Sequence, residues 1–244
     1  MALDNILKPK FQYQLIRLGK KNDGGYLVGE ETVKKADVLI SFGIKNDWSF
    51  EKNFKKINNR AKIKCYDDQL NFKLLVRLFI IQLIFVFKNF KFSLLLKNFI
   101  DIFEYFFIKK KIEFNQEIIT YGDIRKISGN SENIFFKIDI DGHEYRIFDE
   151  LIQIKEKIVG IVIEIHDIDL HFERVLSFCK NIGLELTHIH PNNFAIMDNK
   201  GDPTVIELTF EKSPRKISEN CVLPNPLDMQ NDPETSNISL KFKE

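Results

Sequence analysis

Carboxylate and imidazole side chains gather around an apolar stretch near the middle of the chain. In the segment FFKIDIDGHEY, Asp139 and Asp141 stand at alternate positions, which places them on one face of an extended chain. Gly142 then permits a sharp turn, and His143 follows it. In an open α/β sheet, ligands bind at the carboxyl ends of the strands. The segment therefore predicts an active-site edge, and the alternative is that the two aspartates only cap the next helix.

A second apolar stretch ends in the same kinds of side chain. GIVIEI, at 160–165, carries Glu164 inside the apolar run, and His166 follows directly. A carboxylate at such a position is costly to bury unless it is paired, bound to a metal or used in function. The recurrence favours a functional interpretation of both stretches over simple helix capping.

The elements needed to position these side chains alternate along the chain. Apolar runs predict strands at 36–42, 61–66, 117–120, 135–139 and 160–165, and helical spacing occurs at 144–154 and 169–182. A strand at 184–190 and an antiparallel hairpin of 194–197 with 205–210 complete the pattern. This order predicts an α/β fold with a mostly parallel, Rossmann-like sheet and a C-terminal antiparallel hairpin. The 244 residues suit a single domain, 1–244.

A glycine-containing turn lies near the start of the chain. Asp23, Gly24 and Gly25 form a tight turn before Tyr26, which opens a short strand. One interpretation is an ordinary hairpin turn. The other is a backbone-rich loop that closes over a small charged ligand.

Two strand ends carry further candidate ligand contacts. Gly43 follows the first strand, where one glycine lets the chain pass beneath a nucleoside, although the dinucleotide fingerprint G-x-G-x-x-G is absent. Asp67 ends the second strand, 24 residues beyond Gly43, at a position that commonly holds a ribose hydroxyl pair. The alternative for Asp67 is a solvated turn aspartate.

A basic, Phe- and Leu-rich segment at 69–113 separates the second and third expected strands. Within 69–111, eight Lys and Arg residues stand against two acidic ones, and no Pro or Gly interrupts the segment, which predicts a helical insertion. Its longest uncharged stretch has 10 residues, whereas a membrane span needs about 20. A buried helical hairpin, an oligomer interface, a lid and a helix lying on a membrane surface remain open.

Composition restricts the class of protein and its compartment. The formal net charge of +1 argues against a nucleic-acid binder. Cys65, Cys179 and Cys221 are odd in number and far apart, which fits a reducing compartment. The N-terminus lacks an apolar run of signal-peptide length. We therefore expect a cytoplasmic protein, with the inner membrane face as a peripheral location if 69–111 contacts lipid.

The strand order resembles that of class I S-adenosylmethionine-dependent methyltransferases. FFKIDIDGHEYRIF is similar to the strand-four motif of the FkbM-type family, K-I-D-(V/I)-E-G-x-E, matched here at Lys137, Asp139, Gly142 and Glu144. Asp141 replaces the usual Glu, and His143 stands where a small residue is common. RLGKKNDGGYLV, SFGIKNDWSFE, IVIEIHD and HIHPNNFA also look like blocks of a bacterial branch of this family. The resemblance covers 17–68 and 118–210.

This resemblance implies methyl transfer to a hydroxyl, or to a phosphoryl-type group, on a capsular, lipopolysaccharide or nucleotide-linked sugar. The methyl donor would lie along the 23–26 turn, Gly43, Asp67, Asp123 and Asp139. Asp67 would hold the ribose, and Asp123 or its neighbours the adenine. His188, His190 and Asn192 would orient the small-molecule or glycan-linked acceptor.

A hydroxyl acceptor must lose its proton, and the resemblance leaves two ways to remove it. His166 or His143, assisted by Asp141, would act as general base. Alternatively, magnesium or manganese held by Asp139, Asp141 and Glu164 would lower the pKa of the hydroxyl. Since strands four and five are neighbours in this fold, we expect these side chains to converge on one pocket. A Rossmann-type oxidoreductase or epimerase and a non-catalytic membrane-surface module are the competing classes.

Overall fold

The structure is a computed structural model that describes residues 3–45, 47–68, 80–81, 112–117, 119–199 and 201–243. Almost all of the expected insertion at 69–113 lies outside the described residues, so its helical character and its role stay predictions. Among the described residues, no helix combines the length and the apolar character that a membrane crossing requires.

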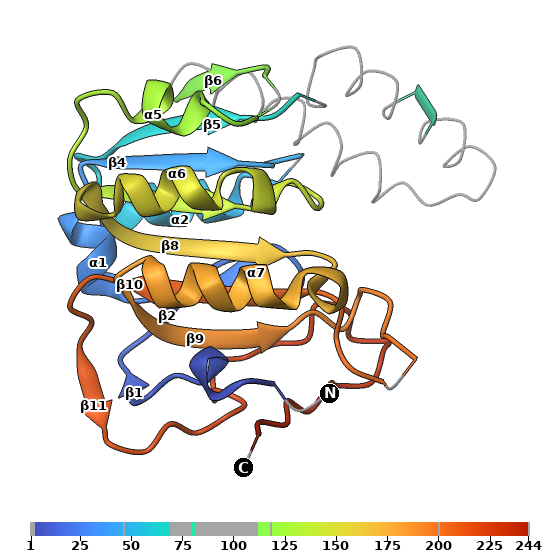
Figure 1. The fold of residues 1–244 in the computed structure, drawn as a ribbon. Helices are drawn as coiled ribbons and strands as arrows, with labels where there is room; N and C mark the ends of the chain where they lie inside the picture. Colours follow the sequence, from blue (N-terminus) through green and yellow to red (C-terminus); the bar gives the residue numbers. More distant parts are fainter. Residues whose placement is uncertain are drawn as a thin grey trace.

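A seven-stranded sheet forms the centre of the molecule (Figure 1). Its spatial order is β6 (Glu113–Asn115), β5 (Lys62–Tyr66), β4 (Val38–Phe42), β7 (Ile134–Ile138), β8 (Ile158–Ile165), β10 (Ile206–Glu211) and β9 (Glu185–Pro191). The pairs from β6 to β8 are parallel, and β10 is antiparallel to both of its neighbours. The predicted mostly parallel α/β sheet with a C-terminal antiparallel hairpin is confirmed.

Helices cover both faces of this sheet, as expected for strands that are apolar on both sides (Figure 1). One face packs against α5 (Asp123–Ser128), α6 (Phe148–Gln153) and α7 (Ile168–Asn181). The other packs against α1 (Glu30–Lys35), α2 (Ser49–Ile57) and the hairpin of β2 (Ile16–Gly19) and β3 (Gly25–Val28). Neighbouring residues such as Phe135 and Phe136 therefore enter different hydrophobic clusters.

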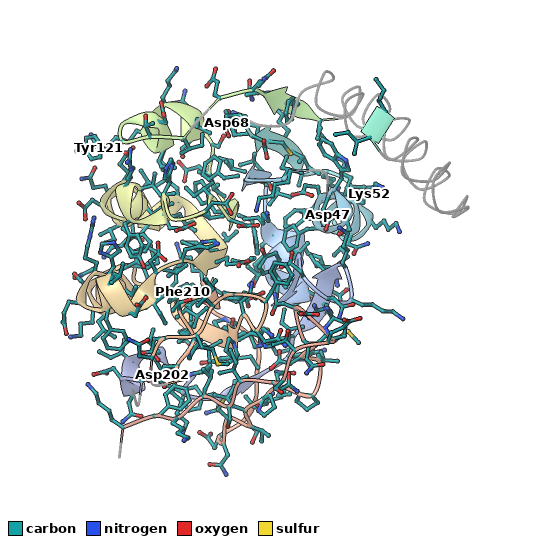
Figure 2. The ribbon with its side chains drawn as sticks, turned by 90° about the vertical axis from the view of Figure 1, so that its right-hand side faces the viewer. Asp47, Lys52, Asp68, Tyr121, Asp202 and Phe210 are labelled. Atoms are coloured by element: carbon teal, nitrogen blue, oxygen red, sulfur yellow. The ribbon has the colours of Figure 1, made fainter. Side chains whose placement is uncertain are left out.

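Short elements complete the described chain. These are the 3-10 turns η1 (Asn5–Leu7), η2 (Glu144–Arg146) and η3 (Lys155–Lys157), and the paired strands β1 (Gln12–Tyr13) and β11 (Lys216–Ser218). Figure 2 shows Phe210 among the interior side chains and Tyr121 at the periphery, in agreement with their exposures of 1% and 70%.

Three expectations about individual elements are wrong. The third strand is β6, which pairs with β5, rather than 117–120. Ile119 is buried in the core without belonging to a strand, which explains the apolar signal there. The hairpin consists of β9 and β10, whereas Met197 makes only an isolated bridge to Pro203. The expected helix at 144–154 is divided into η2 and α6 at Ile147.

Candidate active site

A cavity of about 240 Å³ opens at the carboxyl ends of β4, β5 and β7, where the strand order reverses direction. Its lining residues are Gly43, Lys45, Tyr66, Asp67, Asp68, Glu117, Ile119, Asp139, Ile140, Asp141 and His143. Gly43 adopts a φ of +68°, and a Cβ atom there would lie 1.5 Å from the carbonyl oxygen of Asp139. Only glycine fits this position, because the β4 and β7 ends pass so close to each other.

Asp67 lies where the sequence predicts a ribose contact. It follows β5, is 6% exposed, and accepts a hydrogen bond of 2.6 Å from the backbone N–H of Lys45. Asp123, the predicted adenine contact, does not line the cavity within the described chain. Its carboxylate instead accepts hydrogen bonds of 2.9 Å from the backbone N–H and the hydroxyl of Thr120. Glu117, which the sequence placed in a strand, lines the cavity from the loop after β6.

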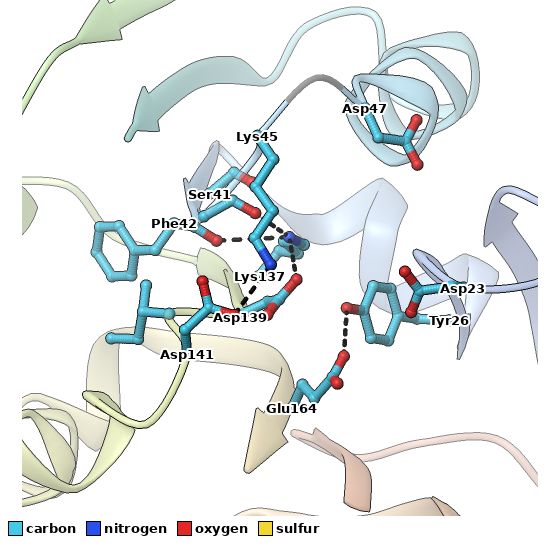
Figure 3. Close-up of polar contacts among 12 residues, drawn as sticks. Asp23, Tyr26, Ser41, Phe42, Lys45, Asp47, Lys137, Asp139, Asp141 and Glu164 are labelled. Atoms are coloured by element: carbon cyan, nitrogen blue, oxygen red, sulfur yellow. Dashed lines mark hydrogen bonds and ion pairs between the residues drawn. The ribbon is translucent and has the colours of Figure 1, made fainter. Parts of the chain in front are cut away.

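A second group of side chains gathers at the ends of β7 and β8. Asp139, Glu164 and His166 each offer one ligand atom, and these atoms all lie within 4.8 Å of one another. Asp141 was expected to join them. Its carboxylate is 52% exposed and pairs with the Nζ of Lys45 at 2.9 Å, so it lies at the mouth of the group (Figure 3).

Glu144 fixes the ring of His166. One carboxylate oxygen of Glu144, Oε1, accepts from the backbone N–H groups of Ile140 and Gly142 and lies 3.1 Å from His166 Nδ1. Glu144 is fully buried. Burial by itself would lower the pKa of His166, but the hydrogen bond to Glu144 and the surrounding carboxylate charges raise the pKa to about 9. With Nδ1 anchored, Nε2 faces Glu164 Oε1 at 3.8 Å.

Glu164 is buried inside β8 and held by two neutral donors. Asn192 Nδ2 donates to Oε1 at 2.7 Å, and the Tyr26 hydroxyl donates to Oε2 at 3.3 Å (Figure 3). Burial, followed by the charges of Asp139 and Glu207, raises the pKa of Glu164 well above its ordinary value. Tyr26, predicted to contact the methyl donor, and Asn192, predicted to contact the acceptor, thus both donate a hydrogen bond to the carboxylate of Glu164.

A row of ionisable side chains crosses the sheet beside Glu164. Glu207 on β10 is the direct cross-strand partner of Glu164 on β8 and of His190 on β9. Glu207 is 4% exposed, and burial raises its pKa to about 7. Two carboxyl groups in adjacent positions repel each other when both are ionised. Glu207 was not among the residues predicted from the sequence, although it stands inside an apolar run as Glu164 does.

The segment after β11 folds back over this row. Asn231, 5% exposed, donates to Glu207 at 2.7 Å and accepts from His190 Nε2 at 3.1 Å. It also donates to the carboxylate of Asp23 at 3.4 Å, which ties the glycine-containing turn to the sheet. No periodic pattern around Asn231 predicts this contact.

His188 and His190, the predicted acceptor contacts, are buried against the same segment. His188 Nε2 lies 2.7 Å from Asp228 Oδ1, and His190 Nδ1 lies 3.7 Å from Asp228 Oδ2. Burial opposes ionisation of Asp228, but the hydrogen bond from His188 and the nearby imidazole of His190 lower its pKa. In the described chain neither histidine lines the cavity containing Gly43; His190 and Asp228 line a separate cavity of about 560 Å³.

Left-handed backbone recurs at three successive strand ends. Lys45, Asp141 and Asp167 have φ values of 52°, 51° and 53°, after β4, β7 and β8. Such conformations are uncommon for residues other than glycine and concentrate at functional sites. All three lie at the edge that carries Asp139 and Glu164.

Lys137, the lysine of the K-I-D motif, contacts the ends of both β4 and β7 at this edge. Its Nζ donates to the carbonyl oxygen of Gly43 at 2.8 Å and lies 3.6 Å from Asp139 Oδ2 (Figure 3). The side chain is buried, so its charge acts in a poorly solvated environment. Lys137 therefore connects the glycine turn after β4 with the first carboxylate of the β7 end.

The spatial strand order, numbered along the chain within the sheet, is 3-2-1-4-5-7-6 with the seventh strand antiparallel. This is the class I methyltransferase fold, a Rossmann-like arrangement. No protein-family model and no curated protein sequence matches the chain.

Comparison with solved structures finds similar folds at low identity. Precorrin-6y C5,15-methyltransferase from Geobacter metallireducens is 12% identical over 75% of this chain and 85% of that chain, with a TM-score of 0.41. TrmK from M. capricolum, in complex with S-adenosyl-homocysteine, is 15% identical over 76% and 67%, with a TM-score of 0.38. Aeropyrum pernix fibrillarin, with natively bound S-adenosyl-L-methionine, is 10% identical over 86% and 87%, with a TM-score of 0.41. At these scores the matches add nothing to what the strand order shows.

Proposed function

We propose that this protein is an S-adenosylmethionine-dependent O-methyltransferase of the FkbM type that acts on a sugar or another glycan building block. The observation that carries the proposal is the cavity at the reversal of strand order, with Gly43 and buried Asp67 at successive strand ends. Beside it lies the group of Asp139, Glu164 and His166. A nucleoside site next to a cluster of proton-accepting groups suits methyl transfer to a hydroxyl.

The donor nucleoside is assigned to the cavity. Gly43 lines the cavity, and the carboxylate of Asp67 accepts from the ribose hydroxyls. Glu117 and Ile119 take the adenine role that the resemblance gave to Asp123, because they line the cavity and Asp123 does not. Methyl transfer is an in-line displacement, so the main contribution of these residues is positioning.

The acceptor is assigned to the side of Glu164 and Tyr26, with Asn192 orienting the carboxylate. Asp139, Glu207 and Asp23 all act electrostatically on Glu164. A phosphoryl group beside the reacting hydroxyl would meet this negative charge, and like-charge contacts cost several kcal/mol. Of the two acceptor types that the resemblance allows, the site therefore favours the hydroxyl.

Removal of the acceptor proton is assigned to His166 rather than His143. The Nε2 atom of His166 faces Glu164, whereas His143 lines the donor cavity. His166 can accept the proton itself, in which case its pKa of about 9 makes the rate rise with pH up to about that value, or it can help to hold a divalent cation that lowers the pKa of the hydroxyl. In the first case EDTA leaves the rate unchanged. In the second, EDTA lowers the rate and added manganese restores it.

Calorimetry with S-adenosylhomocysteine tests the donor assignment. Wild-type protein is expected to bind it, and Asp67→Ala is expected to bind roughly 10- to 150-fold more weakly, which corresponds to about 1.5–3 kcal/mol. Asp123→Ala serves as the matched control and should bind like the wild type. Binding of NADH in place of S-adenosylhomocysteine would favour the oxidoreductase alternative instead.

Transfer of labelled methyl groups to nucleotide-linked sugars or to a bacterial surface-glycan fraction tests the acceptor assignment. Glu164→Ala and His166→Ala are both expected to lower the rate strongly. Wild-type rates in both variants would exclude this placement of the active site.

A further inference from the structure

We infer that Asp139, Glu164 and His166 form a binding site for one divalent transition-metal ion, with Mn²⁺ favoured over Mg²⁺. The ligand atoms of the three side chains lie within 4.8 Å of one another, which small side-chain movements would bring around one ion. As a statement about catalysis this inference rests on the proposed methyl transfer. Binding of the metal ion itself is tested in the absence of donor and acceptor.

His166 is oriented as metal-binding histidines are. Its Nδ1 is 3.1 Å from Glu144 Oε1, and that oxygen is fixed by the backbone N–H groups of Ile140 and Gly142. A carboxylate behind a ligating imidazole sets the tautomer and aims the other nitrogen at the metal. Here the other nitrogen, Nε2, stands 3.8 Å from Glu164 Oε1, which is too long for a hydrogen bond.

The two carboxylates retain capacity for a cation. Glu164 accepts one hydrogen bond at each oxygen, from Asn192 and Tyr26, and every carboxylate oxygen has two lone pairs. Asp139 is 16% exposed, and its ion pair with Lys137 is long, at 3.6 Å. Both carboxylates are thus held in place while oxygen lone pairs face the cluster.

The strongest electrostatic influences on Glu164 are mostly those of other carboxylates. Asp139, Glu207 and Asp23 act on it with negative charge, and among the groups with the largest effect only His166 opposes them. Buried carboxylates in such numbers are normally paired or bound to a cation. Lys137 and Lys45 lie on the side of Asp139 and Asp141, so a divalent ion between Asp139 and Glu164 would add positive charge on the side of Glu164.

The ligand set determines the kind of metal. The set expected from sequence, Asp139, Asp141 and Glu164, offers oxygen atoms only and would suit magnesium. In the structure Asp141 pairs with Lys45 at the mouth, and His166 takes its place in the group. One imidazole nitrogen with two carboxylates suits Mn²⁺, Co²⁺ or Zn²⁺ better than Mg²⁺ or Ca²⁺. Three protein ligands also leave coordination positions open for water and an acceptor hydroxyl.

Binding of Mn²⁺ to full-length protein stripped with EDTA and dialysed tests this site. Calorimetry is expected to give one ion per chain, with weaker binding of Mg²⁺. Electron spin-echo spectroscopy of bound Mn²⁺ is expected to show coupling to an imidazole ¹⁴N nucleus. His166→Gln should abolish that coupling. His166→Gln and Glu164→Gln should each weaken binding at least about 10-fold, and Glu144→Gln about 10- to 100-fold.

Asp141→Asn is the matched control, since it removes a neighbouring carboxylate outside the inferred set. Its Mn²⁺ affinity should fall less than that of Glu164→Gln, because Asp141 Oδ1 lies 3.9 Å from His166 Nε2 but is half-exposed and paired with Lys45, so solvent screens its charge. Circular dichroism and thermal melting establish that each variant is folded. Absence of Mn²⁺ binding to folded wild-type protein at millimolar concentration would overturn the inference. Loss of binding in Asp141→Asn with full binding in His166→Gln would also overturn it.

The two proposals fail separately. Donor binding is measured with S-adenosylhomocysteine and Asp67→Ala, and metal binding is measured with Mn²⁺ alone. A protein that binds the donor but no metal keeps the proposed function with His166 as base. Binding of Mn²⁺ without binding of the donor would support the metal site and contradict the proposed methyltransferase function.

Discussion

Replacing Glu207 by glutamine is expected to remove a large part of the pH dependence of the stability. Burial raises the pKa of Glu207 from 4.5 to about 7 in the folded protein. Between about pH 4.5 and pH 7 the folded chain therefore holds a proton that the unfolded chain has released, so stability falls as pH rises. Above pH 7 the full cost of ionising this group is present, about 3 kcal/mol, and below pH 4.5 it vanishes.

Urea unfolding at pH 5 and pH 8, with EDTA present, measures this effect. From the two pKa values, ionisation of Glu207 contributes about 2–3 kcal/mol to the loss of unfolding free energy between these conditions. Glu207→Gln keeps an oxygen that can accept the 2.7 Å hydrogen bond from Asn231, but it cannot ionise. The variant should therefore lose about 2–3 kcal/mol less than the wild type on going from pH 5 to pH 8.

Glu234→Gln is the control, because it changes the net charge equally at an exposed position. Its pH dependence should match that of the wild type within about 0.5 kcal/mol. If Glu207→Gln followed the wild type as closely, Glu207 would not be a buried acid of raised pKa. The interpretation that Glu207 and Glu164 repel each other within a row of ionisable side chains would then be wrong.

Three further changes probe the same edge. Asn192→Ala removes a 2.7 Å donor from buried Glu164 and should lower the unfolding free energy by about 1–3 kcal/mol in urea; no change would mean that another donor replaces it. Gly43→Ala places a Cβ atom 1.5 Å from the Asp139 carbonyl oxygen, so a large drop in Tm is expected, and an unchanged Tm would contradict the close approach of β4 and β7. Asn231→Ala should speed amide hydrogen exchange at 22–25, because the turn loses the hydrogen bond from Asn231 Nδ2 to Asp23; unaltered exchange would show that the remaining bonds, from Asp23 N–H to the Asn231 carbonyl and from Asn22 to Gln230, hold the turn.

The parallel strands were predictable because both of their faces are buried. β4 and β7 are apolar at nearly every position, and this property belongs to the local sequence. β6 has only Phe114 as an apolar residue among its three, so its pairing with β5 decides its conformation. The partner of β10 was predicted wrongly for a similar reason. Its apolar pattern fits either neighbour, and only the assembled sheet selects β9.

Part of the candidate site was predictable from the sequence, because a charged side chain inside an apolar strand is costly to bury. Glu164 and His166 stood out because they interrupt or end an apolar run, and the same signal in VIELTF would have found Glu207. Glu144 was visible only as part of a motif, and its anchoring of His166 depends on the turn at 140–143. Asn231 lies in a segment without periodicity, so nothing local connects it with β10.

The acidic pair in the middle of the sheet is held there by the apolar residues around it. Ile206, Leu208 and Phe210 of β10 pack into the core on one face, which forces Glu207 onto the other. A shift of one residue in the pairing of β8 and β10 would separate Glu207 from Glu164, but it would also turn all three apolar side chains out of the core.

Burial of those three side chains is worth roughly 1.5–3 kcal/mol each, more in total than the repulsion between the two carboxyl groups. The register therefore keeps Glu164 beside Glu207 whatever their protonation state. The repulsion can be relieved in only two ways within that register, by a retained proton or by a cation. The proton can stay on Glu164, whose pKa is raised, or on Glu207 below about pH 7, whereas a divalent ion at Asp139, Glu164 and His166 would relieve the repulsion without a retained proton.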